Sequence, residues 1–452
     1  MRATYLYTYV FSLVLALFLS VGYLSLTAPH AEAQALTEQD KVRLRAEYDQ
    51  LQAEIAQWQK VLNDTKAKKN TLQGDVTILN AQIKKAETEI KQRSKTISIL
   101  AGEINEKTKR ISTLQNRLED GHASLAKLIR NKNENESVPL AAILLASGNL
   151  SDFFVVSDTI DTINRDLQIR FDELRGVKKE TEAEKKSLSD KKNKELDAKY
   201  EVEIKKAEVK KNEVEKQKLL TITKKDEAAY QQVLAERERR AEAIRTALFE
   251  LRDAQGISFA SALEYASQAE KTTGVRASFI LGILRQESNL GVNVGQCYLT
   301  DSTGAGKGKN TGKLFPNVMH STRDIPPFLE ITSKLNINPY ATVVSCPQSI
   351  GYGGAMGPSQ FIASTWKIYE SKLSKALGVS TPDPWNARHA IMATSLFLKD
   401  LGANKGTYSA EREAAARYYA GGNWQKSGIG YATSVLSFAE KYQTDINFLK
   451  EN

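Results

Sequence analysis

Glu287 is the residue whose type and position best suit a role in catalysis. Three apolar residues precede it at i−7, i−4 and i−3, namely Ile280, Ile283 and Leu284, so all four share one face of a predicted helix. Burial raises the pKa of a carboxyl group, and a carboxyl that keeps its proton near neutral pH can act as a general acid. The position therefore predicts a general acid. The alternative is a helix end at which Glu287 pairs with Arg285 or points into solvent.

A second segment that could bind a ligand or take part in catalysis is Gly351-Tyr352-Gly353-Gly354-Ala355-Met356-Gly357-Pro358-Ser359-Gln360-Phe361. Its small residues allow the backbone to approach a ligand closely. The amide of Gln360 offers both donors and an acceptor, which suits sugar hydroxyls and acetamides. Trp366 follows within a predicted helix, with Tyr369 one turn later. Aromatic faces can serve as sugar platforms, and the alternative is that these rings belong to the core.

The third segment is Tyr418-Tyr419-Ala420-Gly421. The order of Glu287-Ser288, Gly357-x-x-Gln360 and this tyrosine pair resembles the catalytic domain of lytic transglycosylases of the goose-lysozyme-like superfamily, and "GYGGAMGPSQFIASTW" resembles its membrane-bound B-type branch. The resemblance covers roughly residues 258–449. It differs at Tyr419, where the family often has Asn, and at Ala363, where it often has Pro.

The resemblance implies a role for each matching residue. Glu287 is the catalytic acid/base and Tyr418 hydrogen-bonds and positions it. Ser288 helps to fix the acetamide of the glycan. The expected substrate is the glycan strand of peptidoglycan, and no cofactor or metal is expected. The residues expected to bind the substrate are Ser288, Tyr352, Met356, Gly357, Gln360, Trp366 and Tyr419.

Most glycosidases use two carboxylates that flank the scissile bond. This sequence offers no second acid in a matching motif, because Asp301, Asp324 and Asp383 lie in loop-like sequence. A single Glu agrees with a lytic transglycosylase, which forms a 1,6-anhydro sugar without consuming water. Two alternatives remain open. One is a hydrolytic muramidase on the same fold, and the other is a glycan-binding activator or scaffold that is not an enzyme.

The chain has two cysteines, Cys297 and Cys346. In an oxidising compartment such a pair indicates one disulfide, which would close the stretch between the Glu287 helix and the glycine-rich segment. Two Cys and four scattered His show no zinc-type spacing, so no metal site is predicted.

Elements that position these residues differ between the two halves of the chain. Residues 36–251 are rich in Lys, Glu, Gln, Ala and Leu and contain one proline, Pro139. A heptad pattern begins at Leu44 and continues to Leu128, which predicts a left-handed coiled coil. A polar break at 131–139 precedes a second helical arm that starts near Asp158. Two arms with a break between them predict an antiparallel hairpin with a first arm of about ninety residues.

An apolar segment lies near the predicted turn of the hairpin. "LAAILLASGNLSDFFVVSDTIDTINRD" (140–166) resembles the hairpin tip of exported murein-hydrolase regulators and hydrolases that dock on the FtsE–FtsX transporter complex. The resemblance implies an FtsX-like membrane partner at residues near Leu140–Arg165, and regulation of the lytic domain through the coiled coil in cell-wall remodelling or division. The alternative is a pair of short helices that only cap the hairpin.

The N-terminus resembles an export signal. A positive start is followed by an apolar run from Tyr9 to Leu26, and Ala31-Glu32-Ala33 is a cleavage site. The alternative is an uncleaved membrane anchor. Export places the protein outside the cytoplasm, away from nucleic acid, and the formal net charge of +9 suits anionic wall polymers or a solvated rod.

These observations predict an all-α chain of three parts. Residues 1–33 form a signal peptide. Residues 34–254 form a long antiparallel coiled-coil hairpin with an apolar tip segment near 138–165. Residues 255–452 form a lysozyme-like α-helical catalytic domain with glycine-rich connections.

Overall fold

The computed structural model describes residues 38–65, 71–136, 150–222, 227–249, 256–348 and 351–451. Three predictions lie wholly or partly outside these ranges. They are the signal peptide at 1–33, the apolar tip segment up to Asn149, and the boundary between residues 254 and 255. Within the described residues, no helix has both the length and the apolar character needed to cross a membrane.

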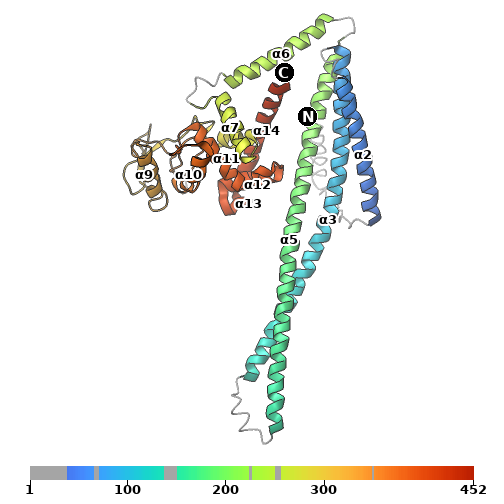
Figure 1. The fold of residues 1–452 in the computed structure, drawn as a ribbon, viewed down its shortest axis with the longest axis vertical. Coiled ribbons are helices and arrows are strands. Elements are labelled where there is room, and N and C mark those ends of the chain that lie inside the picture. Colours follow the sequence, from blue (N-terminus) through green and yellow to red (C-terminus); the bar gives the residue numbers. More distant parts are fainter. Residues whose placement is uncertain are drawn as a thin grey trace, which may run out of the picture. The chain divides into compact units, whose positions relative to one another are not determined.

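The chain divides into two compact units. The first comprises Met1–Arg45 and Ser98–Lys191, and the second comprises Ala46–Ile97 and Lys192–Asn452. The first unit is a two-helix segment, formed by the distal part of α3 (Leu72–Glu136) and much of α5 (Leu150–Leu220). Lys107 Nζ lies 2.6 Å from Glu184 Oε2, and Arg110 Nη2 lies 2.7 Å from Glu180 Oε1. These pairs show that α3 and α5 run antiparallel (Figure 1).

The same antiparallel pairing continues in the second unit, where Lys205 Nζ lies 2.9 Å from Glu89 Oε2. Apolar side chains at heptad spacing fill the seam between the helices, since Leu79, Ile83 and Ala86 of α3 are all buried. The prediction of a helical hairpin is confirmed.

The prediction of one unbroken first arm is wrong. Residues 38–136 form two helices, α2 (Glu38–Thr65) and α3, and α2 folds back along α3 (Figure 1). Gln92 Nε2 donates to Gln52 Oε1 at 2.7 Å, and Thr88 Oγ1 donates to Glu54 Oε1 at 3.0 Å. The heptad count did not reveal the reversal because it continues in register across residues 66–71, which are mostly polar in sequence. Thr71 Oγ1 accepts the backbone N–H of Gly74 and caps the new helix.

Helix α6 (Glu227–Phe249) joins the hairpin to the C-terminal helical region. Its first half packs on the hairpin through a small core of Leu79, Leu219 and Tyr230. The Tyr230 hydroxyl donates to Asp75 Oδ2 at 3.1 Å, and Arg237 Nη1 donates to the same oxygen at 2.6 Å. Apolar packing and a charge-assisted contact thus fix α6 on the base of α3 and α5.

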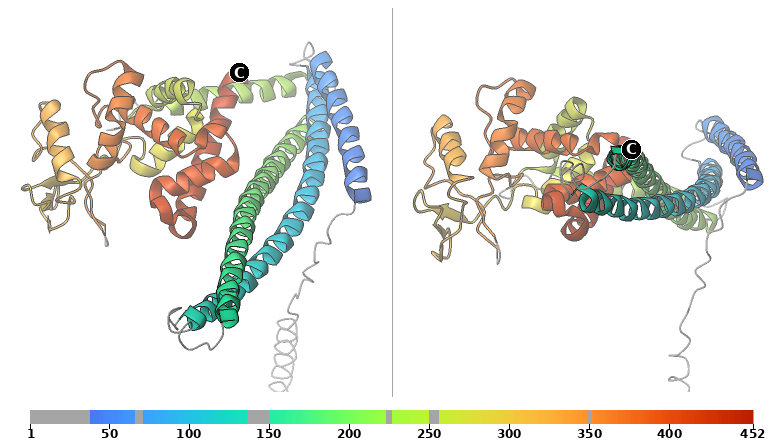
Figure 2. Two further views of the ribbon diagram at one scale, coloured as in Figure 1. Left: turned by 60° about the horizontal axis from the view of Figure 1, so that its bottom comes forward. Right: turned by 90° about the horizontal axis from the view of Figure 1, so that it is seen from below.

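The C-terminal helical region spans residues 256–451 and has one hydrophobic core. Helix α8 (Ala277–Ser288) lies at its centre, and every residue from Ala277 to Leu284 is buried. A Cβ at Gly282 would lie 2.7 Å from the Val435 carbonyl oxygen, so only glycine allows α14 to pack this closely. Both views in Figure 2 show α14 (dark red) close to the yellow segment that contains α8. The surrounding helices are α7 (Phe259–Thr273), α9 (Ile325–Lys334), α10 (Ala363–Leu377), α11 (Ala387–Asp400), α12 (Tyr408–Ala420), α13 (Trp424–Ser427) and α14 (Ile429–Glu451).

The segment between α8 and α9 carries a small antiparallel sheet that the sequence did not predict. Its order is β1 (Cys297–Leu299), β2 (Gly306–Gly308) and β3 (Leu314–Phe315). Strands of two or three residues are too short to show an alternating pattern. The predicted disulfide is present, with the Cα atoms of Cys297 and Cys346 5.1 Å apart. It ties the first strand to the segment that leads into the glycine-rich turn.

Candidate active site

Glu287 occupies the last turn of α8, one residue before the helix ends. The chain then turns sharply, because Asn289, Leu290 and Gly291 all have left-handed backbone conformations, with φ of 53°, 56° and 81°. The backbone N–H of Asn289 donates to the carbonyl of Arg285 and so satisfies the helix end. This abrupt stop leaves the Glu287 side chain half-buried at the edge of the core instead of inside it.

Ser288 connects the end of α8 to the glycine-rich turn. Its side chain is 1% exposed, its hydroxyl donates to the Pro358 carbonyl at 2.6 Å, and it accepts the backbone N–H of Gly291 at 2.9 Å. Both bonds are internal to the protein. In this structure Ser288 therefore positions the turn beside Glu287, and its predicted contact with a glycan acetamide remains a prediction.

The glycine-rich turn runs from Met356 to Phe361, which close it as an antiparallel bridge. A Cβ at Gly357 would lie 2.0 Å from the Pro384 carbonyl oxygen, so this position requires glycine. Gln360 has φ of 51° although it is not glycine, and its side-chain amide donates to the Gly357 carbonyl at 2.8 Å. Non-glycine residues in this conformation are uncommon and concentrate at functional sites.

Helices α11 and α12 hold the same turn from other sides. The Ser359 hydroxyl donates to the Ala390 carbonyl at 2.8 Å and accepts from Thr394 Oγ1 at 2.7 Å. The Tyr418 hydroxyl donates to the Ser359 carbonyl at 2.7 Å. Together with Ser288, these bonds fix the turn to three helices, so that two distant motifs of the sequence meet next to Glu287.

The tyrosine that hydrogen-bonds Glu287 is Tyr431, at the start of α14. Its hydroxyl donates to Glu287 Oε1. The expectation that Tyr418 makes this bond is corrected, because the single hydroxyl proton of Tyr418 is used on Ser359. Tyr418 still lies close by, with its ring nearly parallel to that of Tyr431 and the centroids 6.5 Å apart. Tyr418 therefore lies beside Tyr431 and holds the glycine-rich turn through Ser359.

The pKa of Glu287 is raised to about 7, and the main cause is burial. The hydrogen bond from Tyr431 acts in the opposite direction, because it stabilises the ionised form and lowers the pKa of Glu287. No neighbouring carboxylate in the described ranges contributes to the shift. A pKa near 7 lets one carboxyl group act both as acid and as base near neutral pH.

An exposed aromatic face lies beside the acid. Tyr419 is 59% exposed, and its ring stacks on Tyr431 with centroids 5.0 Å apart and an angle of 13° between the planes. The stack fixes the orientation of Tyr419 and leaves its outer face free. This placement agrees with the predicted role of Tyr419 as a substrate contact, which no direct observation tests.

Two further predicted contacts differ in their placement. Trp366 is corrected to a core residue, since it is 1% exposed and packs edge-on against Phe361. It shares the buried face of α10 with Tyr369 and Leu373, so the helical spacing reflected packing. Tyr352 is 52% exposed and lies against His320, with ring centroids 4.7 Å apart, so it remains accessible.

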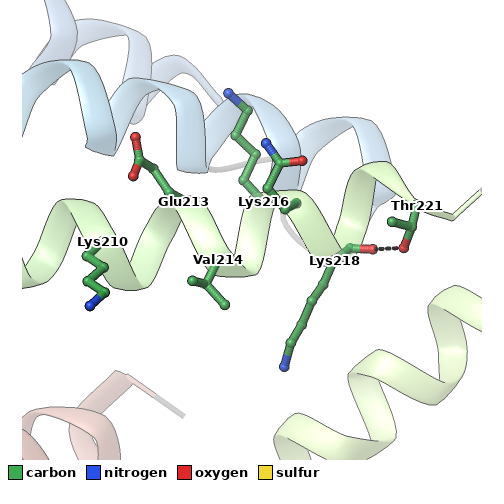
Figure 3. A pocket seen from close by; sticks show the side chains of 7 residues that line it. Lys210, Glu213, Val214, Lys216, Lys218 and Thr221 are labelled. Atoms are coloured by element: carbon green, nitrogen blue, oxygen red, sulfur yellow. Dashed lines mark hydrogen bonds between the residues drawn. The ribbon is translucent and has the colours of Figure 1, made fainter. Parts of the chain in front are cut away.

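No group of three or more His, Cys, Asp or Glu side chains in the described part of the chain could hold a metal ion. One surface cavity of about 700 Å³ lies along the last turns of α5 (Figure 3). In Figure 3, Lys210, Val214 and Lys218 lie on one side of this helix, and Glu213 and Lys216 lie on the other. This cavity is remote in sequence from Glu287 and contains none of the site residues.

Sequence reasoning missed Tyr431 and Ser359. Ser359 appears in the sequence analysis only as a member of the glycine-rich segment, and Tyr431 belongs to none of the motifs named there. A signal was present in Gly428, three residues before the tyrosine, because a glycine permits close packing of the chain. A Cβ at Gly428 would lie 2.3 Å from the Ala416 carbonyl oxygen, which shows how closely the chain passes α12 there.

Three comparisons with known proteins show what this chain resembles. Residues 194–433, more than half of the chain, match the family model described as Transglycosylase SLT domain. Soluble lytic transglycosylase SltB1 from Pseudomonas aeruginosa is 17% identical, with coverage of 39% of this chain and 73% of that one and a TM-score of 0.28. Lytic transglycosylase Slt35 from Escherichia coli, in complex with calcium, is 14% identical, with coverage of 45% and 77% and a TM-score of 0.29. The search of curated proteins found no match.

Proposed function

The chain belongs to the transglycosylase SLT domain family, and on that premise we propose that it is a lytic transglycosylase that cleaves the β-1,4 bond between N-acetylmuramic acid and N-acetylglucosamine in peptidoglycan. The observation that carries the proposal is Glu287, a half-buried carboxyl with a pKa near 7 that accepts a hydrogen bond from Tyr431 beside an exposed tyrosine face. This is the acid that single-carboxylate glycan cleavage needs.

The reaction uses Glu287 twice. Protonated Glu287 first donates its proton to the glycosidic oxygen, so that the bond from C1 of the muramoyl residue to this oxygen breaks and the leaving sugar departs as an alcohol. Ionised Glu287 then accepts the proton of the C6 hydroxyl of the same muramoyl residue, while the oxygen of that hydroxyl bonds to C1. The product is a 1,6-anhydro sugar, Glu287 ends protonated again, and no water is consumed.

Tyr431 suits this cycle because it donates a hydrogen bond to the group that changes charge. A hydrogen bond to a carboxylate is stronger than one to a neutral carboxyl, so Tyr431 stabilises Glu287 at the stage at which it is ionised. Burial acts the other way and keeps the proton on Glu287 at the start. The balance between burial and Tyr431 sets the pKa near neutrality.

The experiment is mass spectrometry of the soluble products after incubation of the full chain with purified sacculi, with Glu287→Gln as the control. Anhydro-muropeptides, which lack one water relative to hydrolysis products, would support the proposal. Products with reducing ends would instead identify a hydrolytic muramidase. The absence of products from a folded chain that binds sacculi would favour a glycan-binding activator or scaffold.

We also propose that the protein acts outside the cytoplasm. We further propose that its hairpin restrains cleavage until a membrane partner engages the tip near Leu140–Arg165. This role of the hairpin is supported by the resemblance of the tip segment to regulators that dock on FtsX-like proteins, together with the pairing of α3 and α5. Charge substitution at Phe153 and Phe154 should leave cleavage by the purified chain unchanged and abolish co-purification with such a partner. Retained co-purification would refute this assignment.

A further inference from the structure

Helix α5 contacts the C-terminal helical region at the first turn of α12. The backbone N–H of Ser409 donates to Asp197 Oδ1 at 2.6 Å, and the Ser409 hydroxyl donates to Asp197 Oδ2 at 3.0 Å. Thr407 caps the same helix within its own chain segment, by accepting the N–H of Ala410. Asp197 thus supplies a second cap for α12, although it lies more than two hundred residues earlier in the sequence.

A tyrosine pair adjoins this cap. The rings of Tyr200 and Tyr408 stack with centroids 4.0 Å apart and an angle of 16°. Burial against the helical region raises the pKa of Tyr200 to about 12. Asp197 and Tyr200 are three residues apart and lie on one face of α5, so one short stretch of the hairpin makes both contacts.

Beneath this contact lies a polar junction that unites the helices of the active site. Arg276, the residue that precedes α8, forms two hydrogen bonds to Glu411 of α12, at 2.7 and 2.6 Å, and Glu411 is 1% exposed. The Ser278 hydroxyl donates to Gln443 of α14 at 2.8 Å. Helices α8, α12 and α14 carry Glu287, the Tyr418–Tyr419 pair and Tyr431, respectively. The junction therefore fixes the relative positions of the acid and its tyrosines.

The contact is polar and incompletely filled. A cavity of about 380 Å³ lies between α5 and the helical region, and its lining includes Asp197 and Tyr200 from one side and Arg276, Tyr408 and Glu440 from the other. Small, polar interfaces between parts of a chain usually permit relative motion. The helical region keeps its own apolar core, so its integrity does not depend on this contact.

We propose that Asp197 and Tyr200 form a detachable latch on the first turn of α12, through which the hairpin controls the order of the helix that carries Tyr418 and Tyr419. Attachment caps α12 and covers the Arg276–Glu411 pair. Release leaves the Ser409 N–H without its carboxylate and opens the junction to water. The regulatory part of this inference rests on the proposed function, whereas the attachment itself does not.

The test is hydrogen–deuterium exchange of the full chain, comparing Asp197→Ala/Tyr200→Ala with the wild type. Loss of a helix cap should make exchange in peptides from 407–413 about tenfold faster. The matched control is Glu203→Ala/Lys206→Ala, which removes an exposed ion pair from the same helix. A second variant, Tyr200→Phe, keeps the ring stack and Asp197 and should retain protection.

The outcomes separate the latch from the lytic activity. If Asp197→Ala/Tyr200→Ala exchanges at 407–413 at the same rate as the control variant, the latch is overturned. Faster exchange at 407–413 and also at 414–424, with release of muropeptides from sacculi raised at least threefold relative to the control, would support it fully, because the hairpin is proposed to restrain cleavage. Lowered release would contradict this restraint. Faster exchange with unchanged release would refute control of the active site. Faster exchange when even the wild type releases nothing would support attachment and count against the lytic function.

Discussion

The hydroxyl of Tyr431 donates a hydrogen bond to the carboxyl of Glu287, 144 residues earlier in the chain. The two residues come from α14 and α8, which pack closely because Gly282 has no side chain. Burial raises the pKa of Glu287 and this bond lowers it, so the two effects act on one proton. The chemistry of the site depends on how these helices meet.

Glu287→Gln should lower the rate of glycan cleavage by at least about a hundredfold, because general acid–base catalysis contributes on this scale. The amide keeps the shape of the carboxyl group, so binding to sacculi in a pelleting assay should be retained. The rate is measured as release of anhydro-muropeptides. Turnover within tenfold of the wild type would remove Glu287 from its role.

The rate should fall as the pH rises above about 7, since the first step requires protonated Glu287. Tyr431→Phe removes a hydrogen bond that lowers the pKa of Glu287, so the pKa of the variant is higher and the alkaline limb moves to higher pH. The measurement is kcat/KM against pH for both proteins. A limb that stays in place, or moves to lower pH, would contradict the assigned hydrogen bond.

Glu287 should also make the fold less stable as the pH rises. Its folded pKa of about 7 lies above the ordinary value of 4.5, so the stability that the protonated group contributes is complete below pH 4.5 and is lost as the pH rises through 7. Gln does not titrate. The Tm of Glu287→Gln minus that of the wild type should therefore increase between pH 5 and pH 8, as followed by circular dichroism. A difference that is constant with pH would show that Glu287 is not desolvated.

Trp366 and Tyr419 should respond in opposite ways to replacement by Ala. Trp366→Ala should destabilise the fold by about 3–5 kcal/mol because it leaves a cavity in the core. Tyr419→Ala removes an exposed ring and should change stability by less than about 1 kcal/mol while it weakens glycan binding. Urea denaturation and sacculus binding distinguish the two. Wild-type binding by a folded Tyr419→Ala would exclude Tyr419 as a substrate contact.

Cys297→Ala/Cys346→Ala should lower stability by about 2–4 kcal/mol, because the disulfide closes a loop with a sequence separation of 49 residues. The same loss is expected for the wild type in a reducing agent, and the variant should be insensitive to that agent. Denaturation curves with and without reductant measure both. An equal response of the two proteins to reductant would mean that the bond does not form in solution.

The sequence revealed more of this molecule where a pattern repeats or a motif is local. Heptads predicted the hairpin, and the order of Glu287, Gln360 and Tyr418 predicted the site. The reversal between α2 and α3 stayed hidden because the heptad count continues in register through residues 66–71. Tyr431 stayed hidden because its partner is 144 residues away, and no local spacing encodes a contact between two helices. Trp366 shows the reverse case, in which helical spacing fits both a sugar platform and a core, and only burial decides.

The end of α8 immediately after Glu287 has an electrostatic consequence. The last carbonyl groups of a helix carry a partial negative charge, which opposes ionisation of a nearby carboxyl group. Asn289, Leu290 and Gly291 hold that end in place by their left-handed backbone. An ionised Glu287 is thus repelled by the end of its own helix, and in the proposed reaction this repulsion would favour the return of the proton. If Glu287 acts as proposed, the backbone that ends the helix would help to reset the acid for the next bond.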